Sequence, residues 1–406
     1  MNRGEVMQYR IDPISENKLS ILGFGCMRFP RSRGQIDIVK TEELIIGAVE
    51  HGINYFDTAY IYGGCEEALG EIIHKNEIRD QIYLATKLPL GKCQSPEDFD
   101  TLFNEQLDRL HTDHFDYYLM HNLSDTKLWK RLCDMGIESW LSTKKDIGQI
   151  RQIGFSFHGA QKEFMALLDL YDWDFCQIQY NYINTEYQAG AAGLKRAADK
   201  GLPVIIMEPL LGGSLANSLP QKAQKIFRNA NHSCSPAEWA FRWLWNQPEI
   251  TVVLSGMNAA AQLEENLKIA SCAVPNMLTE AETAVFQLVV EAFNNSYKIP
   301  CTGCNYCMPC PHKVNIPGCF AAYNMSYAVG RFSGFNQYMT STGATDPSKN
   351  YAASQCRKCG KCEKHCPQQI PIIQSLQSVK KRMEPFWYKP MVSMFIKIRE
   401  RKSKNA

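Results

Sequence analysis

The sequence lacks the features that would assign it to a membrane, secreted or nucleic-acid-binding class. No uninterrupted apolar run approaches the ~20 residues needed to span a bilayer. The opening, MNRGEVMQYRIDP, shows neither the apolar core nor the cleavage site of a secretory signal, so we expect a cytoplasmic protein. Lys and Arg number 44 against 42 Asp and Glu, a net charge of +2, so we expect no nucleic-acid partner.

Cysteine is abundant instead. The 406 residues include 16 cysteines, and nine of them follow residue 300. Reducing pools in the cytoplasm keep thiols reduced, which argues against structural disulfides there. Clustered, evenly spaced cysteines in that compartment predict a metal site.

Residues 20–270 alternate short apolar runs with amphipathic helical patterns. Eight such repeats in about 250 residues predict an α/β fold, a (β/α)8 barrel. A doubly wound open sheet is the alternative, but it usually has a Gly-rich turn after its first strand, and LGFGCMRFP lacks that turn. The predicted strands are 19–25, 53–58, 82–87, 115–121, 153–157, 175–180, 204–208 and 251–255.

Polar side chains stand where three successive predicted strands end. Asp57 and Tyr62 follow the second strand, Lys87 ends the third, and His121 ends the fourth. The βα loops of a barrel open on one face, so these side chains should meet there. A lysine ammonium favours a nearby phenolate, an aspartate holds the lysine, and a histidine can donate to a carbonyl oxygen. The alternative is a structural ion pair with a core histidine.

These segments resemble the aldo-keto reductase family over residues 18–270. The resemblance is carried by FDTAYIYGGCEEALGEII, ATKLP, DYYLMHN and LGFGCMRFP. It implies that Asp57, Tyr62, Lys87 and His121 form a catalytic tetrad, with Tyr62 donating a proton to a carbonyl that receives hydride from NAD(P)H. The substrate would be a small carbonyl or alcohol compound.

The same resemblance implies a set of cofactor-binding residues. Ser156 and Gln177 would contact the nicotinamide, and Gly212 and Gly213 the pyrophosphate. The sequence has Phe157 where the family often has Asn, and residues 255–259 lack the Lys or Arg that would hold a 2′-phosphate, which favours NADH. The adenosine end would lie against Gly256, Gln262, Glu265 and Asn266.

Two cysteine motifs follow residue 300. Each has three two-residue-spaced cysteines and a fourth cysteine before proline, and the second motif has the bacterial ferredoxin spacing. That pattern predicts two [4Fe-4S] clusters, with the fourth cysteine of each motif binding the other cluster. Zinc is the competing metal. The predicted ligand sets are Cys301, Cys304, Cys307 and Cys366, and Cys356, Cys359, Cys362 and Cys310.

The predicted domains are a barrel over 1–278, a connecting helix over 279–300, a mainly α-helical ferredoxin-like domain over 301–378 and a basic amphipathic tail over 379–406. The clusters would serve electron transfer, and an acidic ferredoxin or a flavoprotein would be the partner. The tail is either solvated or a docking arm for such a partner or a membrane surface. The alternative function is an electron-transfer or redox-sensing protein whose barrel has little turnover.

Overall fold

The computed structural model describes residues 6–344, 350–388 and 390–394. The chain forms two compact units: one combines Met1–Pro209 with Glu238–Leu278, and the other combines Leu210–Ala237 with Thr279–Ala406. The last part of the predicted basic tail, residues 395–406, lies outside the described residues. None of the described helices has the length and apolar character that a membrane crossing requires.

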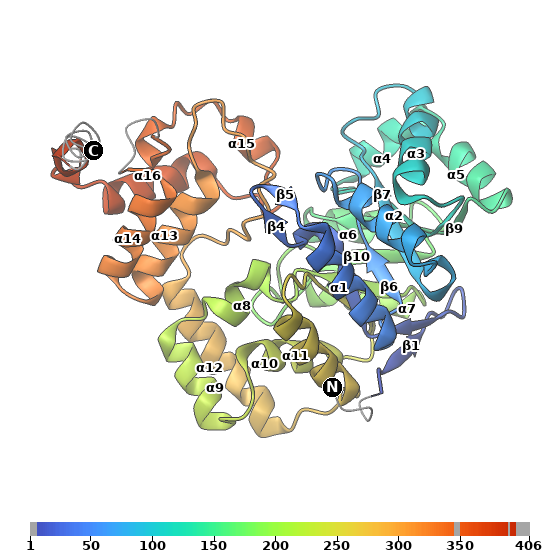
Figure 1. The fold of residues 1–406 in the computed structure, drawn as a ribbon, viewed down its shortest axis with the longest axis horizontal. Helices are drawn as coiled ribbons and strands as arrows, with labels where there is room; N and C mark the ends of the chain where they lie inside the picture. Colours follow the sequence, from blue (N-terminus) through green and yellow to red (C-terminus); the bar gives the residue numbers. More distant parts are fainter. Residues whose placement is uncertain (1–5, 345–349, 389, 395–406) are drawn as a thin grey trace. The chain divides into compact units, whose positions relative to one another are not determined.

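The first unit is built on a closed barrel of parallel strands (Figure 1). Their order around the barrel is β10-β11-β12-β3-β6-β7-β8-β9, so neighbours in sequence are neighbours in space. The prediction of a (β/α)8 barrel is therefore confirmed. The strands are β3 (Leu22–Gly25), β6 (Tyr55–Asp57), β7 (Tyr83–Leu88), β8 (Phe115–Met120), β9 (Ile150–Phe157), β10 (Phe175–Gln179), β11 (Val204–Met207) and β12 (Ile250–Ser255).

The first predicted strand, 19–25, is divided in two. Its beginning is β2 (Lys18–Ser20), which pairs antiparallel with β1 (Tyr9–Ile11) outside the barrel. Asn54 accepts a hydrogen bond from the Ser20 backbone N–H, and the Ser20 hydroxyl donates to the carbonyl of Leu22 at 2.8 Å. These side-chain contacts interrupt the strand at Ser20, and the barrel strand begins two residues later.

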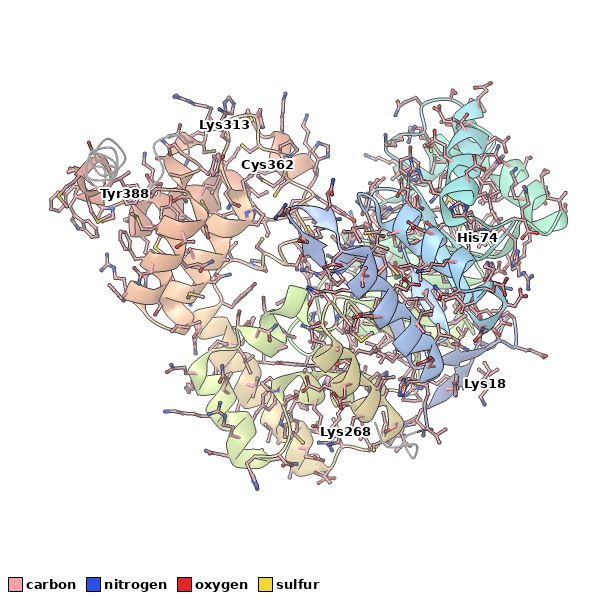
Figure 2. All side chains as sticks on the ribbon, viewed as in Figure 1. Lys18, His74, Lys268, Lys313, Cys362 and Tyr388 are labelled. Carbon is pink, nitrogen blue, oxygen red and sulfur yellow. The ribbon has the colours of Figure 1, made fainter. Side chains whose placement is uncertain are left out.

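Helices follow the barrel strands and turn polar side chains outward. His74 on α2 and Lys268 on α11 are examples that can be followed in Figure 2. Two helices, α4 and α5, occupy the connection between β8 and β9. The helices are α1 (Ile38–Glu50), α2 (Cys65–Lys75), α3 (Glu97–Leu110), α4 (Thr126–Asp134), α5 (Ile137–Asp146), α6 (Gln161–Leu167), α7 (Gly190–Asp199), α10 (Pro236–Trp245) and α11 (Ala260–Ser271).

Aromatic side chains fill the end of the barrel at which the strands begin. The Tyr117 ring meets Tyr55 and Phe175 edge to face, each at a centroid distance of 5.1 Å. Gly154 makes room for this layer, because a Cβ there would stand 2.6 Å from the Phe175 ring. Since this end of the barrel is packed and apolar, polar chemistry is left to the ends of the strands.

The second unit is helical. Its helix α9 (Gln221–Ala230) packs on α12 (Glu280–Ser296), where the Phe227 and Phe286 rings lie 5.7 Å apart. A capping box of Thr279 and Glu282 starts α12. The remaining elements are η3 (Leu211–Gly213), α8 (Ser214–Asn217), α13 (Ile316–Ala328), α14 (Arg331–Ser341), η4 (Ala353–Gln355), α15 (Lys361–Lys364) and α16 (Ile372–Met383).

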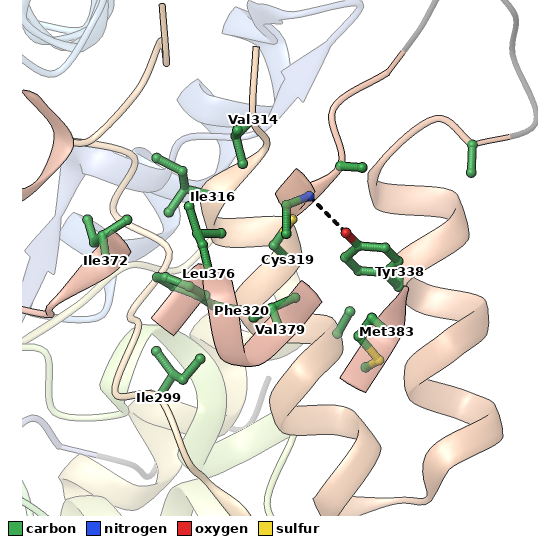
Figure 3. Packing of buried hydrophobic residues seen from close by; sticks show 14 of the residues in the cluster. Ile299, Val314, Ile316, Cys319, Phe320, Tyr338, Ile372, Leu376, Val379 and Met383 are labelled. Atoms are coloured by element: carbon green, nitrogen blue, oxygen red, sulfur yellow. Dashed lines mark hydrogen bonds between the residues drawn. The ribbon is translucent and has the colours of Figure 1, made fainter. Parts of the chain in front are cut away.

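Helices α13, α14 and α16 enclose a second hydrophobic core (Figure 3). Tyr338 is buried in it and accepts a hydrogen bond from the backbone N–H of Ala353 at 2.8 Å. The Trp387 ring packs on Phe335 at 5.3 Å, so part of the predicted tail lies against this core. The cysteine motifs run between these helices in loops with little regular structure.

Candidate active site and metal centres

A buried ion pair lies where strands β6 and β7 end. The Lys87 ammonium is 2.7 Å from each carboxylate oxygen of Asp57 and donates to the Thr58 carbonyl at 2.6 Å. The Lys87 and Asp57 side chains are only 1% and 5% exposed. Gln177 on β10 donates to Asp57 at 3.0 Å. With these bonds both charges are balanced and hydrogen-bonded, as buried charges need to be.

Tyr62 and His121 stand next to this pair. Lys87 Nζ is 5.4 Å from the centre of the Tyr62 ring, and the Tyr62 and His121 rings meet edge to face at 6.0 Å. Tyr62 lies in the turn between β6 and α2, where its backbone N–H donates to Ala59. The structure thus brings the four residues of the predicted tetrad together.

The environment of His121 keeps its imidazole neutral. Burial lowers its pKa well below the ordinary value, and the positive charge of Lys87 and the nearby His158 lower it further. A neutral imidazole at this place can donate one hydrogen bond to an oxygen without bringing a second positive charge beside Lys87.

A polar network on the outer side of β7 fixes the strand that carries Lys87. Gln106 donates to the Lys87 carbonyl at 3.1 Å and to Glu66 at 2.6 Å, and Thr86 also donates to Glu66. Sequence reasoning missed this network, although Glu66 lies within the segment that carries the family resemblance. Neighbouring Cys65 is buried, and burial raises its pKa to about 11, which suits packing rather than nucleophilic attack.

Two of the predicted nicotinamide contacts are neighbours on the barrel wall. Gln177 is the register partner of Ser156 on the adjacent strand β9. The Ser156 hydroxyl accepts a hydrogen bond from the Asn122 N–H at 2.9 Å. The Gln177 side-chain oxygen is buried without a hydrogen-bond partner. A carboxamide N–H would satisfy that oxygen, so these residues fit a nicotinamide.

His158 follows the end of β9 and lies near His121, whose pKa it helps to lower. Phe157, the last residue of the strand, packs on α6, with its ring 5.0 Å from that of Phe164. The Nδ1 atom of His158 lies 3.0 Å from the Gln188 oxygen, and burial lowers the pKa of this histidine to about 4. Sequence reasoning could not assign His158 to the site, since its contacts depend on how β9 and the neighbouring loops pack.

The predicted adenosine residues lie after β12. Gln262 accepts a hydrogen bond from the Asn258 N–H, Asn266 donates to the Ser255 hydroxyl, both at 2.9 Å, and Glu265 is exposed. A Cβ on Gly256 would stand 3.3 Å from the side chain of Arg28. This arginine brings a cation to a loop that has none of its own, and its place could not be predicted from the loop sequence.

The two predicted pyrophosphate glycines belong to the second unit, whereas the other predicted cofactor residues belong to the first. Gly212 has φ of +66° and Gly213 has φ of +91°, a left-handed conformation that favours glycine. A Cβ on Gly212 would stand 2.1 Å from the carbonyl oxygen of Thr302. Gly212 therefore lets the first cysteine loop pack directly on η3.

The first predicted ligand set surrounds one pocket. Cys301, Cys304, Cys307 and Cys366 all line one small pocket that is partly open to solvent. Ile316, Phe320, Ile370 and Ile372 supply its apolar wall. Burial raises the pKa of the Cys307 thiol to about 12, and the other three cysteines of the set raise it further. A positively charged iron group would stabilise these thiolates, so the donor set fits such a group.

Three members of the second predicted set also lie together. Burial raises the pKa of Cys362 to about 11, and nearby Glu363, Cys310 and Cys356 contribute in the same direction. Cys359, the fourth member, is exposed. As they stand in the described part of the chain, no three His, Cys, Asp or Glu side chains are already arranged around one metal position, so both ligand sets remain predictions from the cysteine spacing. Cys319, outside both motifs, is buried in the helical core.

Comparison with known proteins matches both parts of the chain. The aldo/keto reductase family model matches residues 21–280, and a 4Fe-4S dicluster domain model matches residues 300–370. An aldo-keto reductase of Mycolicibacterium vanbaalenii is 26% identical over 63% of this chain and 84% of its own length. The NADH-specific methylglyoxal reductase of Escherichia coli is 24% identical over 68% of this chain and 95% of its own.

Solved structures show the same fold for the barrel. An aldo-keto reductase from Bacillus halodurans, in its holo form, has a TM-score of 0.58 and 24% identity, and the match covers 70% of this chain and 97% of that chain. The family model covers more than half of the present sequence. The chain therefore belongs to the aldo/keto reductase family and carries a 4Fe-4S dicluster domain after its barrel.

Proposed function

We propose that the barrel reduces a small carbonyl compound with NAD(P)H, or oxidises the corresponding alcohol. The observation that carries this proposal is the buried pair of Lys87 and Asp57 beside Tyr62 and His121. A structural ion pair alone would not need a tyrosine and a neutral histidine at the same strand ends. Four groups with complementary acid–base roles at the open end of a barrel suit catalysis.

Each of the four residues has a defined task in this proposal. Tyr62 donates a proton to the substrate oxygen, and the Lys87 ammonium favours the phenolate that remains. Asp57 balances and orients Lys87 through the two 2.7 Å contacts. Neutral His121 donates a hydrogen bond to the same oxygen as negative charge develops on it.

The nicotinamide supplies the hydride when it is bound. Ser156 and Gln177 would hold its carboxamide, Gly212 and Gly213 its pyrophosphate, and Gly256, Gln262, Glu265 and Asn266 its adenosine end. The orphaned oxygen of Gln177 supports this assignment. Because Arg28 lies beside Gly256, both NADH and NADPH should be titrated.

The cysteine motifs would bind two [4Fe-4S] clusters that carry single electrons, in exchange with an acidic ferredoxin or a flavoprotein. Support comes from the pocket that Cys301, Cys304, Cys307 and Cys366 share and from the proximity of Cys310 and Cys356 to Cys362. Clusters move one electron and a nicotinamide moves two, so the two chemistries need not share a step.

Replacing Tyr62 with Phe tests the barrel proposal. The change removes the proton donor and keeps the ring, so turnover should fall about 10²–10⁴-fold while the Kd for NAD(P)H stays nearly unchanged. Methylglyoxal is a suitable first substrate, because the Escherichia coli relative is named as its reductase. Unchanged turnover in the variant would refute the role of Tyr62, and a protein that binds neither nicotinamide would refute the reductase.

A further inference from the structure

The two cysteine loops differ in charge. The first, Cys301–Cys310, contains no Lys, Arg, Asp or Glu, and its pocket has apolar walls. The second, Cys356–Cys366, is one residue longer and contains four cations and one acid. The cations are Arg357, Lys358, Lys361 and Lys364.

These cations face solvent and have no acidic partner. All four are exposed, and none makes an ion pair within the described residues. Glu363, the acid among them, is partly buried and accepts a hydrogen bond from the Ile373 N–H at 2.9 Å, at the start of α16. Glu363 is therefore held by the backbone of α16, and it forms no ion pair with the four cations.

A fifth cation extends this surface. Lys313 is exposed, and its backbone N–H donates to the carbonyl of Cys310, which lies near Cys362. Figure 2 labels Lys313 and Cys362 in the same part of the second unit. We call the exposed cations Lys313, Arg357, Lys358, Lys361 and Lys364, together with exposed Cys359, the basic cysteine face.

Balancing the negative thiolates does not explain this face. The two loops carry the same number of predicted ligands, yet the first contains no cation. Of the eight predicted ligands only Cys359, in the second loop, is exposed. Cations gathered in the loop that holds the exposed cysteine point to a contact made in solvent.

We propose that the basic cysteine face docks an acidic one-electron carrier protein. The inference rests on the proposed electron-transfer role of the cysteine motifs. In each encounter a reduced carrier loses one electron and the iron–sulfur group held by the second set gains it, with no bond made or broken. Complementary charge would speed such brief encounters, and salt would weaken them.

The test compares two double variants of the full-length protein, prepared without oxygen. Lys358→Gln with Lys361→Gln removes two charges from the face. Lys380→Gln with Lys381→Gln removes two exposed charges from the other end of α16 and is the matched control. The probe is a small acidic [2Fe-2S] ferredoxin, and its Kd is measured by titration at low and at high salt, beside iron content and cluster reduction potential.

At low salt the first variant should bind the ferredoxin roughly tenfold more weakly than the parent, and the control should bind like the parent. The difference should disappear at high salt, with iron content unchanged. Equal affinities in both variants, or a loss confined to the control, would overturn the proposal. Heparin serves as a second, non-protein polyanion. A loss of heparin binding as large as the loss of ferredoxin binding would also overturn the proposal, and so would an altered reduction potential with unaltered ferredoxin affinity.

The proposed reductase function can fail separately. Absence of NAD(P)H-dependent carbonyl reduction, with the expected difference in ferredoxin affinity, would refute the barrel chemistry and leave the docking face intact. Zinc in place of iron would refute the electron-transfer role.

Discussion

The barrel site and the cysteine sites handle charge in opposite ways. In the barrel, the Lys87 ammonium meets the Asp57 carboxylate at 2.7 Å, so the site is electrically complete within the fold. In the first cysteine set, Cys307 is surrounded by three other thiols, and its pKa is raised to about 12. The comparison teaches that the charges of the barrel site are balanced before any ligand binds. The cysteine sites, by contrast, need a bound cation to stabilise the deprotonated form of their thiols.

Removing one predicted ligand should have the largest effect. Cys366→Ala takes away the fourth member of the first set, so iron should fall from about eight to about four per chain. The second unit should lose stability, because metal binding contributes to its folding free energy and one cluster is then missing. Iron analysis and thermal unfolding measure both effects.

The matched control is Cys319→Ala, since Cys319 is buried in the same unit outside both motifs. It should keep all its iron. Loss of the same amount of iron in both variants would show that the helical core, and not ligation by Cys366, controls iron binding.

Breaking the ion pair between Lys87 and Asp57 should have a smaller effect. It tests directly whether the charges of the barrel site are balanced within the fold. Lys87→Met leaves the Asp57 carboxylate buried without its partner and should lower the free energy of unfolding by about 3–5 kcal/mol. Adding Asp57→Asn should recover much of that loss, because the buried charge is then gone. Urea unfolding of the three variants and the parent measures the coupling, and additive losses would contradict it.

The smallest expected effect is a pH dependence from His158. Its folded pKa of about 4 lies below the ordinary 6.5. Between these values the unfolded chain binds a proton that the folded chain does not, so stability should decrease as pH falls from 6.5 towards 4, by at most ~1.4 kcal/mol per pH unit. His158→Gln should flatten this slope. His74→Gln, on the exposed side of α2, should leave it unchanged.

The strands, and the meeting of the four polar side chains at their ends, were predictable because their signals are local. Apolar runs mark strands buried on both faces, and polar residues after them mark the open end of the barrel. The eight-fold repeat predicts helical structure between β8 and β9, but the division of that segment into the two helices α4 and α5 is a local feature that the repeat does not specify. Arg28, Glu66 and His158 could not be identified as neighbours of the site, since each reaches it through packing or register between distant segments.

Segment 210–237 leaves the barrel between β11 and α10 and belongs to the second unit, where its helix α9 packs on α12. The peptide chain therefore passes between the two units three times, at 209, 237 and 278. A truncation after residue 278 would strip α12 from α9 and expose the buried ring of Phe227 to water. An isolated reductase half would have to retain α12, so the boundary for independent folding lies beyond the last strand and helix of the barrel.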